Sequence, residues 1–448
     1  MSENYAANGI RLAPSCWDSP ARAHIKQASE AMNSSPEALL HTVLTRVSAT
    51  TLPSVVVDTV IDQPASLNVI AALIGPPGTG KGRAIRHASK LLPFSNEHGP
   101  EELGLTTGEG LIEAYIGVDD LTGERVQIHD KAFAATTEAA VLAQCVTRAG
   151  NTLQAHLCSA WMAEALITST ADLDRRRKIL ADEYRFSGVM AAQPDVADAF
   201  LSSGYLGLPQ RIAWAPSTRQ AGTRVPLDER PAWPGELQVE GLGTLASCLE
   251  SLVDVKLVLP PQAVIELEAI AEALEDGWGE EHPLDTHEPL WKSKYAALLA
   301  LLDGTVEIDM AHWRLATAMW DASCNQRELM VLEAENRRRT QRAVEAGQRV
   351  HLGASIRQAQ KMVDEGAPLP VRQVAIRMGR KAHASPVPLT AAQLKDAASA
   401  QSKKNAEACG VKSLIPDARM YATIQGWIEQ SSDGRWIAGS EEPPAPGQ

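Results

Sequence analysis

The sequence predicts an α/β fold in which a mostly parallel sheet is flanked by helices and followed by a helical region and a small C-terminal domain. Two observations support this prediction. Strand and helix patterns alternate from about residue 67 to residue 216, and the strand at 67–74 is a continuous apolar run from residue 69 to residue 74. A continuous apolar strand is typical of a parallel sheet that has helices on both faces.

The N-terminal region, residues 1–65, shows two helical patterns and one strand pattern. Helices are expected at 21–32 and 36–47, and the second has Ser34 and Ser35 just before Pro36, a plausible cap and first-turn proline. A β-branched run at 54–61 favours a strand.

The main α/β core is expected at residues 66–217, where apolar runs are bounded by turn-forming residues. The predicted strands are 67–74, 125–130, 184–192 and 211–216, and the predicted helices are 80–92, 131 to about 168, and 195–202.

A linker and a helical, lid-like region are expected at residues 218–350. The linker is rich in Pro, Arg and Gly, and the helical patterns that follow lie at 243–254, 261–278, 291–320 (with a turn and a short extended piece at 306–308) and 325–350. The basic C-terminal domain, 351–440, combines short helices with an Asp433-Gly434 turn, which fits a winged helix or a helical interaction domain. Residues 441–448 form a Pro-rich, flexible tail.

Composition and charge narrow the functional classes. The chain has 448 residues, 44% hydrophobic and 22% charged, with no apolar run long enough to cross a bilayer and no N-terminal signal pattern. We therefore expect a cytoplasmic protein with no membrane partner. Its six cysteines have no metal-ligand spacing.

Positive charge is concentrated in one segment. Residues 337–412 hold fifteen Lys and Arg against five Asp and Glu, although the whole chain has a net charge of -13. This segment offers phosphate contacts for nucleic acid, and the alternative is a solvated helix face beside an acidic domain.

The most informative motif is a glycine-rich turn between the strand at 67–74 and the helix at 80–92. Its glycines let main-chain N–H groups turn toward phosphate oxygens, Lys81 can reach the β- and γ-phosphates, and the following helix directs its positive end at the same anion. The pattern predicts an ATP-binding phosphate loop made of Gly75, Pro76, Pro77, Gly78, Thr79, Gly80, Lys81 and Gly82.

Gly82 departs from the Walker A pattern, because Ser or Thr at that position usually gives its hydroxyl to Mg²⁺. Other residues and water must then hold the metal, or nucleotide binding is weakened. The alternative is a glycine-rich turn in a degenerate domain.

Hydrolysis also needs an acid for the Mg²⁺ shell and a group that orients water. Asp130 ends the predicted strand 125–130 and is the candidate Walker B acid, with Asp119 and Asp120 as rivals. Glu109 stands in a glycine-flanked segment and is a candidate to polarise the attacking water, or else part of a helix cap or turn.

Two further residues are expected beside the sheet. Gln193 closes the strand 184–192, so it should lie at the carboxyl edge, where it can sense the γ-phosphate. Arg211 opens the next strand and is the candidate arginine for a neighbouring subunit's site, with Lys294 and Arg314 as alternatives.

These motifs resemble the P-loop, helicase-like proteins of phages and bacterial mobile elements that accompany primase-polymerase domains. The similarity lies in residues 65–82, 107–111, 187–194 and 207–216 and extends through 297–304 and 313–316, so it covers roughly residues 15–325. The resemblance implies a RecA-like ATPase core in which Lys81, Glu109, Gln193 and Arg211 lie in family motifs. Asp130 is in the weakest-matching stretch.

The preferred hypothesis is an ATP-dependent motor, a replicative DNA helicase of a phage or mobile element. It would act as a homo-oligomeric ring on single-stranded DNA, with ATP and Mg²⁺ as cofactors and a separate primase or primase-polymerase as a partner. The alternative is an AAA+-like ATP switch, such as a replication initiator, helicase loader or phage-defence regulator, that does not unwind DNA.

Overall fold

A computed structural model of the chain describes residues 10–59, 64–105, 107–119, 123–137, 152–168, 177–194, 207–275 and 285–445. It divides the chain into two compact units, Met1–Asn336 and Arg337–Gln448. The first unit joins the expected regions 1–65 and 66–217 with most of 218–350, because residues from Leu12 to Met330 share one hydrophobic core.

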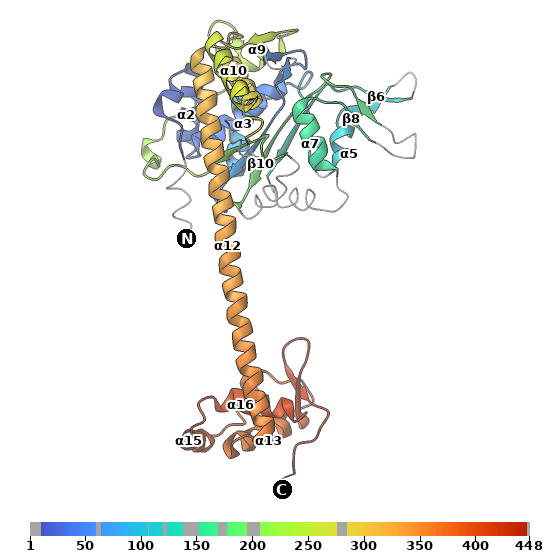
Figure 1. The fold of residues 1–448 in the computed structure, drawn as a ribbon, viewed down its shortest axis with the longest axis vertical. Helices are drawn as coiled ribbons and strands as arrows, with labels where there is room; N and C mark the ends of the chain where they lie inside the picture. The colour runs from blue at the N-terminus through green and yellow to red at the C-terminus, as the bar shows by residue number, and fades with distance from the viewer. Residues whose placement is uncertain are drawn as a thin grey trace. The chain divides into compact units, whose positions relative to one another are not determined.

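The centre of the first unit is a five-stranded, all-parallel sheet (Figure 1). Its strands in spatial order are β11 (Ile212–Pro216), β3 (Val69–Ile74), β10 (Arg185–Ala192), β7 (Lys131–Thr136) and β4 (Glu101–Leu103). Every residue of β3 and β10 is buried, which requires cover on both faces. The mixed α/β arrangement is compatible with a RecA-like fold.

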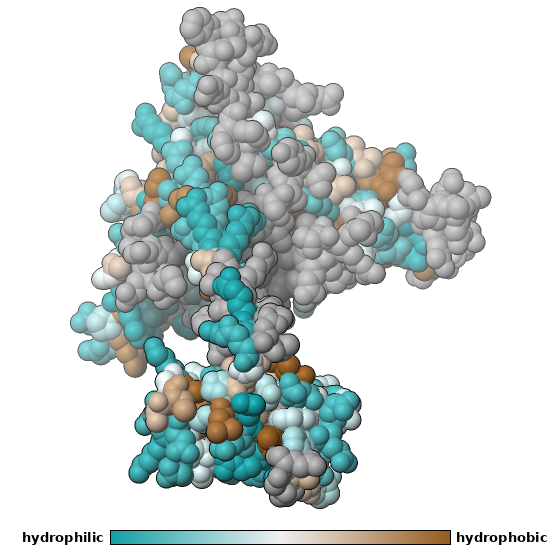
Figure 2. All heavy atoms as spheres, turned by 60° about the horizontal axis from the view of Figure 1, so that its bottom comes forward, coloured by the Kyte–Doolittle hydropathy of each residue, from teal (hydrophilic) through white to brown (hydrophobic). Residues whose placement is uncertain are grey.

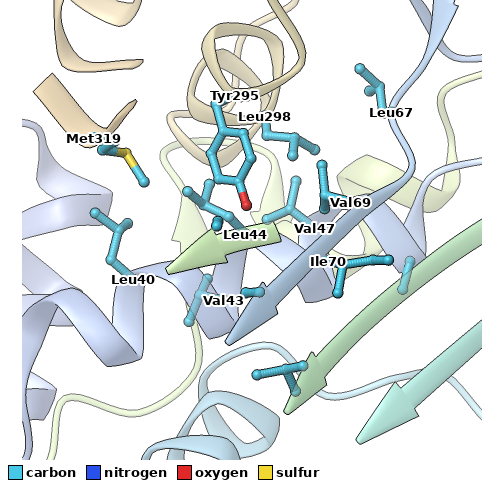
Figure 3. Close-up of a cluster of buried hydrophobic side chains, with 14 of the residues drawn as sticks. Leu40, Val43, Leu44, Val47, Leu67, Val69, Ile70, Tyr295, Leu298 and Met319 are labelled. Atoms are coloured by element: carbon cyan, nitrogen blue, oxygen red, sulfur yellow. The ribbon is translucent and has the colours of Figure 1, made fainter. Parts of the chain in front are cut away.

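Helix α3 (Pro36–Thr50) covers one face of this sheet and contacts β3, β7, β10 and β11. Ser35 caps it by accepting a hydrogen bond from Ala38 N, with Pro36 at the first helical position, as the sequence predicts. In Figure 3, the apolar side chains of α3 lie between β3 and helix α11 (Glu288–Leu302), and they include Leu44 and Val47.

The remaining elements of the first unit surround this core. The helices are α2 (Pro20–Ala31), α4 (Lys81–Leu91), α5 (Gly108–Glu113), α7 (Leu153–Met162), α9 (Leu245–Glu250), α10 (Pro261–Glu275) and the first part of α12 (Met310–Asp364). A small sheet joins β14 (Lys256–Val258), β1 (Val56–Asp58) and β2 (Ala65–Ser66). Antiparallel pairs are formed by β5 (Ile116–Val118) with β6 (Arg125–Gln127), β8 (Leu166–Ile167) with β9 (Lys178–Ile179), and β12 (Gln238–Val239) with β13 (Gly243–Thr244).

The sequence prediction is wrong at the third strand of the core. The segment 125–130 contributes only β6, which pairs with β5 outside the main sheet, and the strand of the main sheet is instead β7, between β10 and β4. The residues from Lys131 to Thr136 were expected to start a helix, because Ala is the strongest helix former. Pairing with β10 and β4 on either side overrides that preference.

Other predictions differ less. The piece at 306–308 is not a strand, and the helices expected before and after residue 325 are one helix, α12. The helix expected at 195–202 lies outside the described residues.

The second unit has its own hydrophobic core. Its elements are the last part of α12, α13 (Leu369–His383), α14 (Ala391–Lys395), α15 (Ala400–Ala408), α16 (Leu414–Ile424), β15 (Ile428–Gln430) and β16 (Trp436–Ala438). Helix α13 packs on α16 and also contacts α14, α15 and the β15–β16 hairpin. Leu389, before α14, bridges to Trp436 in β16.

Most of the coloured surface in Figure 2 is hydrophilic, and the hydrophobic patches between are small. Within the described ranges, none of the helices combines the length and the apolar character needed to span a bilayer.

Candidate nucleotide-binding site at the carboxyl edge of the sheet

The segment Gly75 to Gly80 links the end of β3 to the start of α4 and lies at the carboxyl edge of the sheet. Gly78 and Gly80 have φ angles of +81° and +88°, which L residues with a Cβ adopt only at a cost. Gly80 is the N-cap of α4 and supplies no side-chain oxygen to its first turn. The first N–H groups of the helix are thus not capped by that residue, and they can bind an anion.

The loop is packed closely against the ends of two neighbouring strands. Gly75 N donates to Ala192 O of β10 at 3.3 Å, and Thr79 Oγ1 lies 2.7 Å from Oγ of Ser217, which follows β11. A Cβ added to Gly75 would lie 2.3 Å from Ser217 Oγ, so only glycine fits without movement. Thr79 Oγ1 also donates to Pro76 O at 2.9 Å. These contacts fix the first half of the loop.

Lys81 is the first residue of α4, and its side chain folds back over the loop. Its Nζ donates to Gly75 O at 2.6 Å and to Pro76 O at 2.9 Å. The side chain is partly exposed, so the ammonium lies at the loop where a phosphate oxygen can take the place of a carbonyl acceptor.

Gly82 lies next to the end of β7. A Cβ added to Gly82 would have Thr137 Cγ2 at 3.9 Å as its nearest neighbour in the described part of the chain, which is an ordinary contact. Thr137 is exposed, and the preceding Thr136 has a buried Oγ1 with no hydrogen-bond partner among the described residues. The sequence interpretation did not include either threonine, because it assigned this segment to a helix.

Gln193 follows β10 directly and is exposed at the carboxyl edge, as the sequence predicts. The preceding residue, Ala192, accepts the hydrogen bond from Gly75 N, so Gln193 directly follows the residue of β10 that contacts the loop.

Glu109 lies in the first turn of α5, which Thr107 caps by accepting from Gly110 N. Its carboxylate is exposed and accepts a hydrogen bond from Thr152 Oγ1 at 3.2 Å. The helix-cap interpretation of this segment is therefore confirmed, and a catalytic role for Glu109 stays a prediction.

Asp130 is not at the carboxyl edge, so the premise of its assignment as a Walker B acid is wrong. It stands immediately before β7, and its carbonyl oxygen accepts from Arg185 N at 2.7 Å at the start of β10. All five strands are parallel, so Asp130 is at the amino edge, on the far side of the sheet from Lys81. The rival Asp119 belongs to the turn between β5 and β6, and position 120 lies outside the described residues.

Arg211 also lies at the amino edge, because it precedes β11. Its Nη1 donates to Gly207 O at 2.7 Å, and its guanidinium carbon is 5.7 Å from the centre of the Trp161 ring. Burial lowers the pKa of Arg211. The side chain therefore packs on its own subunit.

The two alternatives to Arg211 are placed differently. Lys294 is only 1% exposed and donates to Asn68 O and Trp161 O. The prediction that its ammonium reaches a nucleotide is therefore wrong. Burial lowers its pKa well below the ordinary value of a lysine. Arg314 is exposed on α12.

Three hydroxyl groups at the carboxyl edge were missed by sequence reasoning: those of Ser217, Thr136 and Thr137. Each is separated from the loop by many residues, and only the pairing of β7, β10, β3 and β11 brings them to one edge. Among the described residues, no group of three or more His, Cys, Asp or Glu is arranged to hold a metal ion.

Comparison of the chain with protein-family models and with curated proteins gives no match.

Proposed function

We propose that the chain is an ATP-dependent DNA motor, a replicative helicase of a phage or mobile element. The observation that carries this proposal is the turn from Gly75 to Gly80, which joins the carboxyl end of β3 to the start of α4 with Lys81 folded over it. Ligands of open α/β sheets bind outside the carboxyl ends of the strands. A helix N-terminus and a lysine at that place suit a polyphosphate.

In this proposal ATP binds with its phosphates in the loop 75–82. Phosphate oxygens then replace the two main-chain carbonyl oxygens as the hydrogen-bond acceptors of Lys81 Nζ. Gln193 is the residue beside the loop that is suited to sense the γ-phosphate, because it is exposed one residue after the main-chain contact with Gly75. Glu109 remains the candidate that orients the attacking water. Mg²⁺, when bound, would neutralise the charge that develops on the phosphates.

A ring of identical subunits is proposed because Arg211 is at the edge opposite its own loop. Any contact of this guanidinium with a nucleotide requires the loop of a neighbouring subunit. The basic residues of the second unit would supply phosphate contacts along single-stranded DNA. Priming would be the task of a separate primase or primase-polymerase.

The test is ATP hydrolysis by the wild type and by Lys81→Ala, each with and without single-stranded DNA. We expect turnover that rises with DNA in the wild type and is lost in Lys81→Ala, because the ammonium that binds the phosphates is removed. Lys90→Ala, a lysine in the last turn of α4, is the matched control and should behave as the wild type. A rate of ATP hydrolysis that single-stranded DNA does not change would argue against a motor.

One observation favours the second candidate function, an AAA+-like ATP switch that acts on duplex DNA. In the second unit, α15 and α16 are joined by a turn in which Gly410 has a φ of +72°, and the β15–β16 hairpin follows. Leu389 bridges to Trp436 and adds a third extended segment beside the hairpin. Three helices with such a hairpin fit the winged-helix interpretation, and helix-turn-helix modules bind duplex DNA.

Strand displacement on a forked substrate separates the two candidates. A motor unwinds the fork when it hydrolyses ATP, whereas a switch binds the duplex arm and releases no strand. The Lys81→Ala variant is the control for unwinding that depends on ATP.

A further inference from the structure

The nucleotide site has a vacancy at Gly82, the position that gives a hydroxyl to Mg²⁺ in a Walker A loop. Glycine cannot supply that ligand, and Mg²⁺ takes near-octahedral oxygen coordination in which protein oxygens commonly join the phosphates and water. If the proposed function holds, another side chain has to supply the missing hydroxyl.

Thr137 is the side chain that reaches the vacancy. Its Cγ2 lies 3.9 Å from the position of a Cβ at Gly82, and no other atom in the described ranges comes within 4 Å of that position, apart from the chain neighbours and the backbone of α4. The methyl and the hydroxyl of a threonine are attached to the same Cβ. A rotation of about 120° about χ1 exchanges them between staggered positions, so the hydroxyl can face Gly82.

The fold also places Thr137 on the correct edge. It follows the last residue of β7, one residue beyond the pair Thr136 and Met190, and β10 separates β7 from β3. Thr137 is exposed, so a ligand outside the carboxyl edge has access to it. A Cβ added at position 82 would meet only the ordinary 3.9 Å contact with Thr137 Cγ2.

We propose that the Thr137 hydroxyl replaces the missing Walker A hydroxyl and binds the nucleotide's divalent cation from the end of β7. In this arrangement the ligand has moved from the first turn of α4 to the neighbouring strand end. The assignment predicts that a second substitution rescues the first, because a hydroxyl introduced at position 82 should substitute for the one removed from position 137.

The test measures the affinity of the full chain for mant-ATP by fluorescence, once with Mg²⁺ and once with EDTA. The quantity compared between variants is the dissociation constant with EDTA divided by the dissociation constant with Mg²⁺. A general loss of folding or of binding affects both constants and cancels in this ratio. We expect Thr137→Val to reduce this ratio by about tenfold, the scale on which partners of a metal site act. Thr137→Ser should keep the ratio, because it keeps the hydroxyl.

Two further variants sharpen the result. Gly82→Ser in the Thr137→Val background should restore the ratio. Thr136→Val is the matched control on the same strand and should leave the ratio unchanged. It removes a buried hydroxyl that has no partner among the described residues, so it should not destabilise the chain.

The outcomes distinguish the two proposals. If the wild type does not bind mant-ATP, the proposed function itself fails. If the wild type binds with a clear Mg²⁺ enhancement and Thr137→Val keeps it, Thr137 is not the ligand and the proposed function still stands. A wild type that binds equally well with Mg²⁺ and with EDTA would also overturn the assignment of Thr137.

Discussion

Gly75 is the position where one added methyl group tests the packing of the candidate site. A Cβ at this residue lies 2.3 Å from Ser217 Oγ and 2.9 Å from Thr79 Oγ1, so at least one hydroxyl has to move. Ser217 is only 2% exposed and cannot turn into solvent. Overpacking at a closed site costs about 1–3 kcal/mol, and we expect Gly75→Ala to lower the free energy of unfolding by about 2 kcal/mol.

A double-mutant cycle with Ser217 isolates this contact. Ser217→Ala loses the 2.7 Å hydrogen bond to Thr79 Oγ1, which still donates to Pro76 O, so it should cost about 1 kcal/mol. In the double variant the closest clash is absent and Thr79 can turn. We therefore expect the pair to cost about 1 kcal/mol rather than the additive value of about 3 kcal/mol.

The assay is urea unfolding followed by tryptophan fluorescence. Eight of the ten tryptophans lie in the unit Met1–Asn336, so the signal reports mainly the unit that contains the site. Gly82→Ala is the control: its new methyl group meets nothing closer than 3.9 Å in the described structure, and in a helix it should stabilise by about 0.5–1 kcal/mol. Additive losses in the cycle would refute the packing argument.

Three further predictions concern other parts of the chain. Asp130→Asn should leave ATP hydrolysis within about twofold of the wild type, because Asp130 lies at the amino edge; a loss of about tenfold, or 1.4 kcal/mol, would contradict this placement. Burial lowers the pKa of His41 from 6.5 to about 4, so the unfolded chain binds this proton more readily and stability falls as the pH drops from about 6.5 to about 4. His41→Phe should remove up to about 3 kcal/mol of that loss, measured by urea unfolding at several pH values, and an unchanged pH dependence would rule the histidine out. Replacing the exposed Lys403 and Lys404 of α15 by Ala should lower the slope of log K against log salt for DNA binding by about two, in an anisotropy titration, if both contact phosphate.

The sequence predicts the parts of the fold that are coded locally. The strand β3, the helix α4 and the cap of α3 follow from an apolar run, a glycine-rich turn and a Ser-Pro pair, and the structure confirms all three. The strand β7 could not be predicted in this way. Its Ala-rich sequence resembles a helix, and only its position between β10 and β4 makes the extended form favourable.

The candidate site shows the same division. The loop 75–82 was predicted because all its residues are adjacent in the sequence. Ser217 and Thr137 could not be predicted, since they reach the loop only through the order of strands in the sheet. The error for Asp130 has the same cause: placing a strand six residues too early moved its last residue to the wrong edge.

The two edges of the sheet differ in what they can offer to an anion. At the amino edge, Lys294 and Arg185 are at most 1% exposed, and both donate to main-chain carbonyls inside the fold. A phosphate there would have to displace buried hydrogen bonds and open the core, which costs several kcal/mol for each charged group left without a partner. At the carboxyl edge, Lys81 is partly exposed and donates to two carbonyls of a glycine-rich turn, so a phosphate can replace them without unfolding. Of these three cations, only Lys81 can give its charge to a ligand without opening the core.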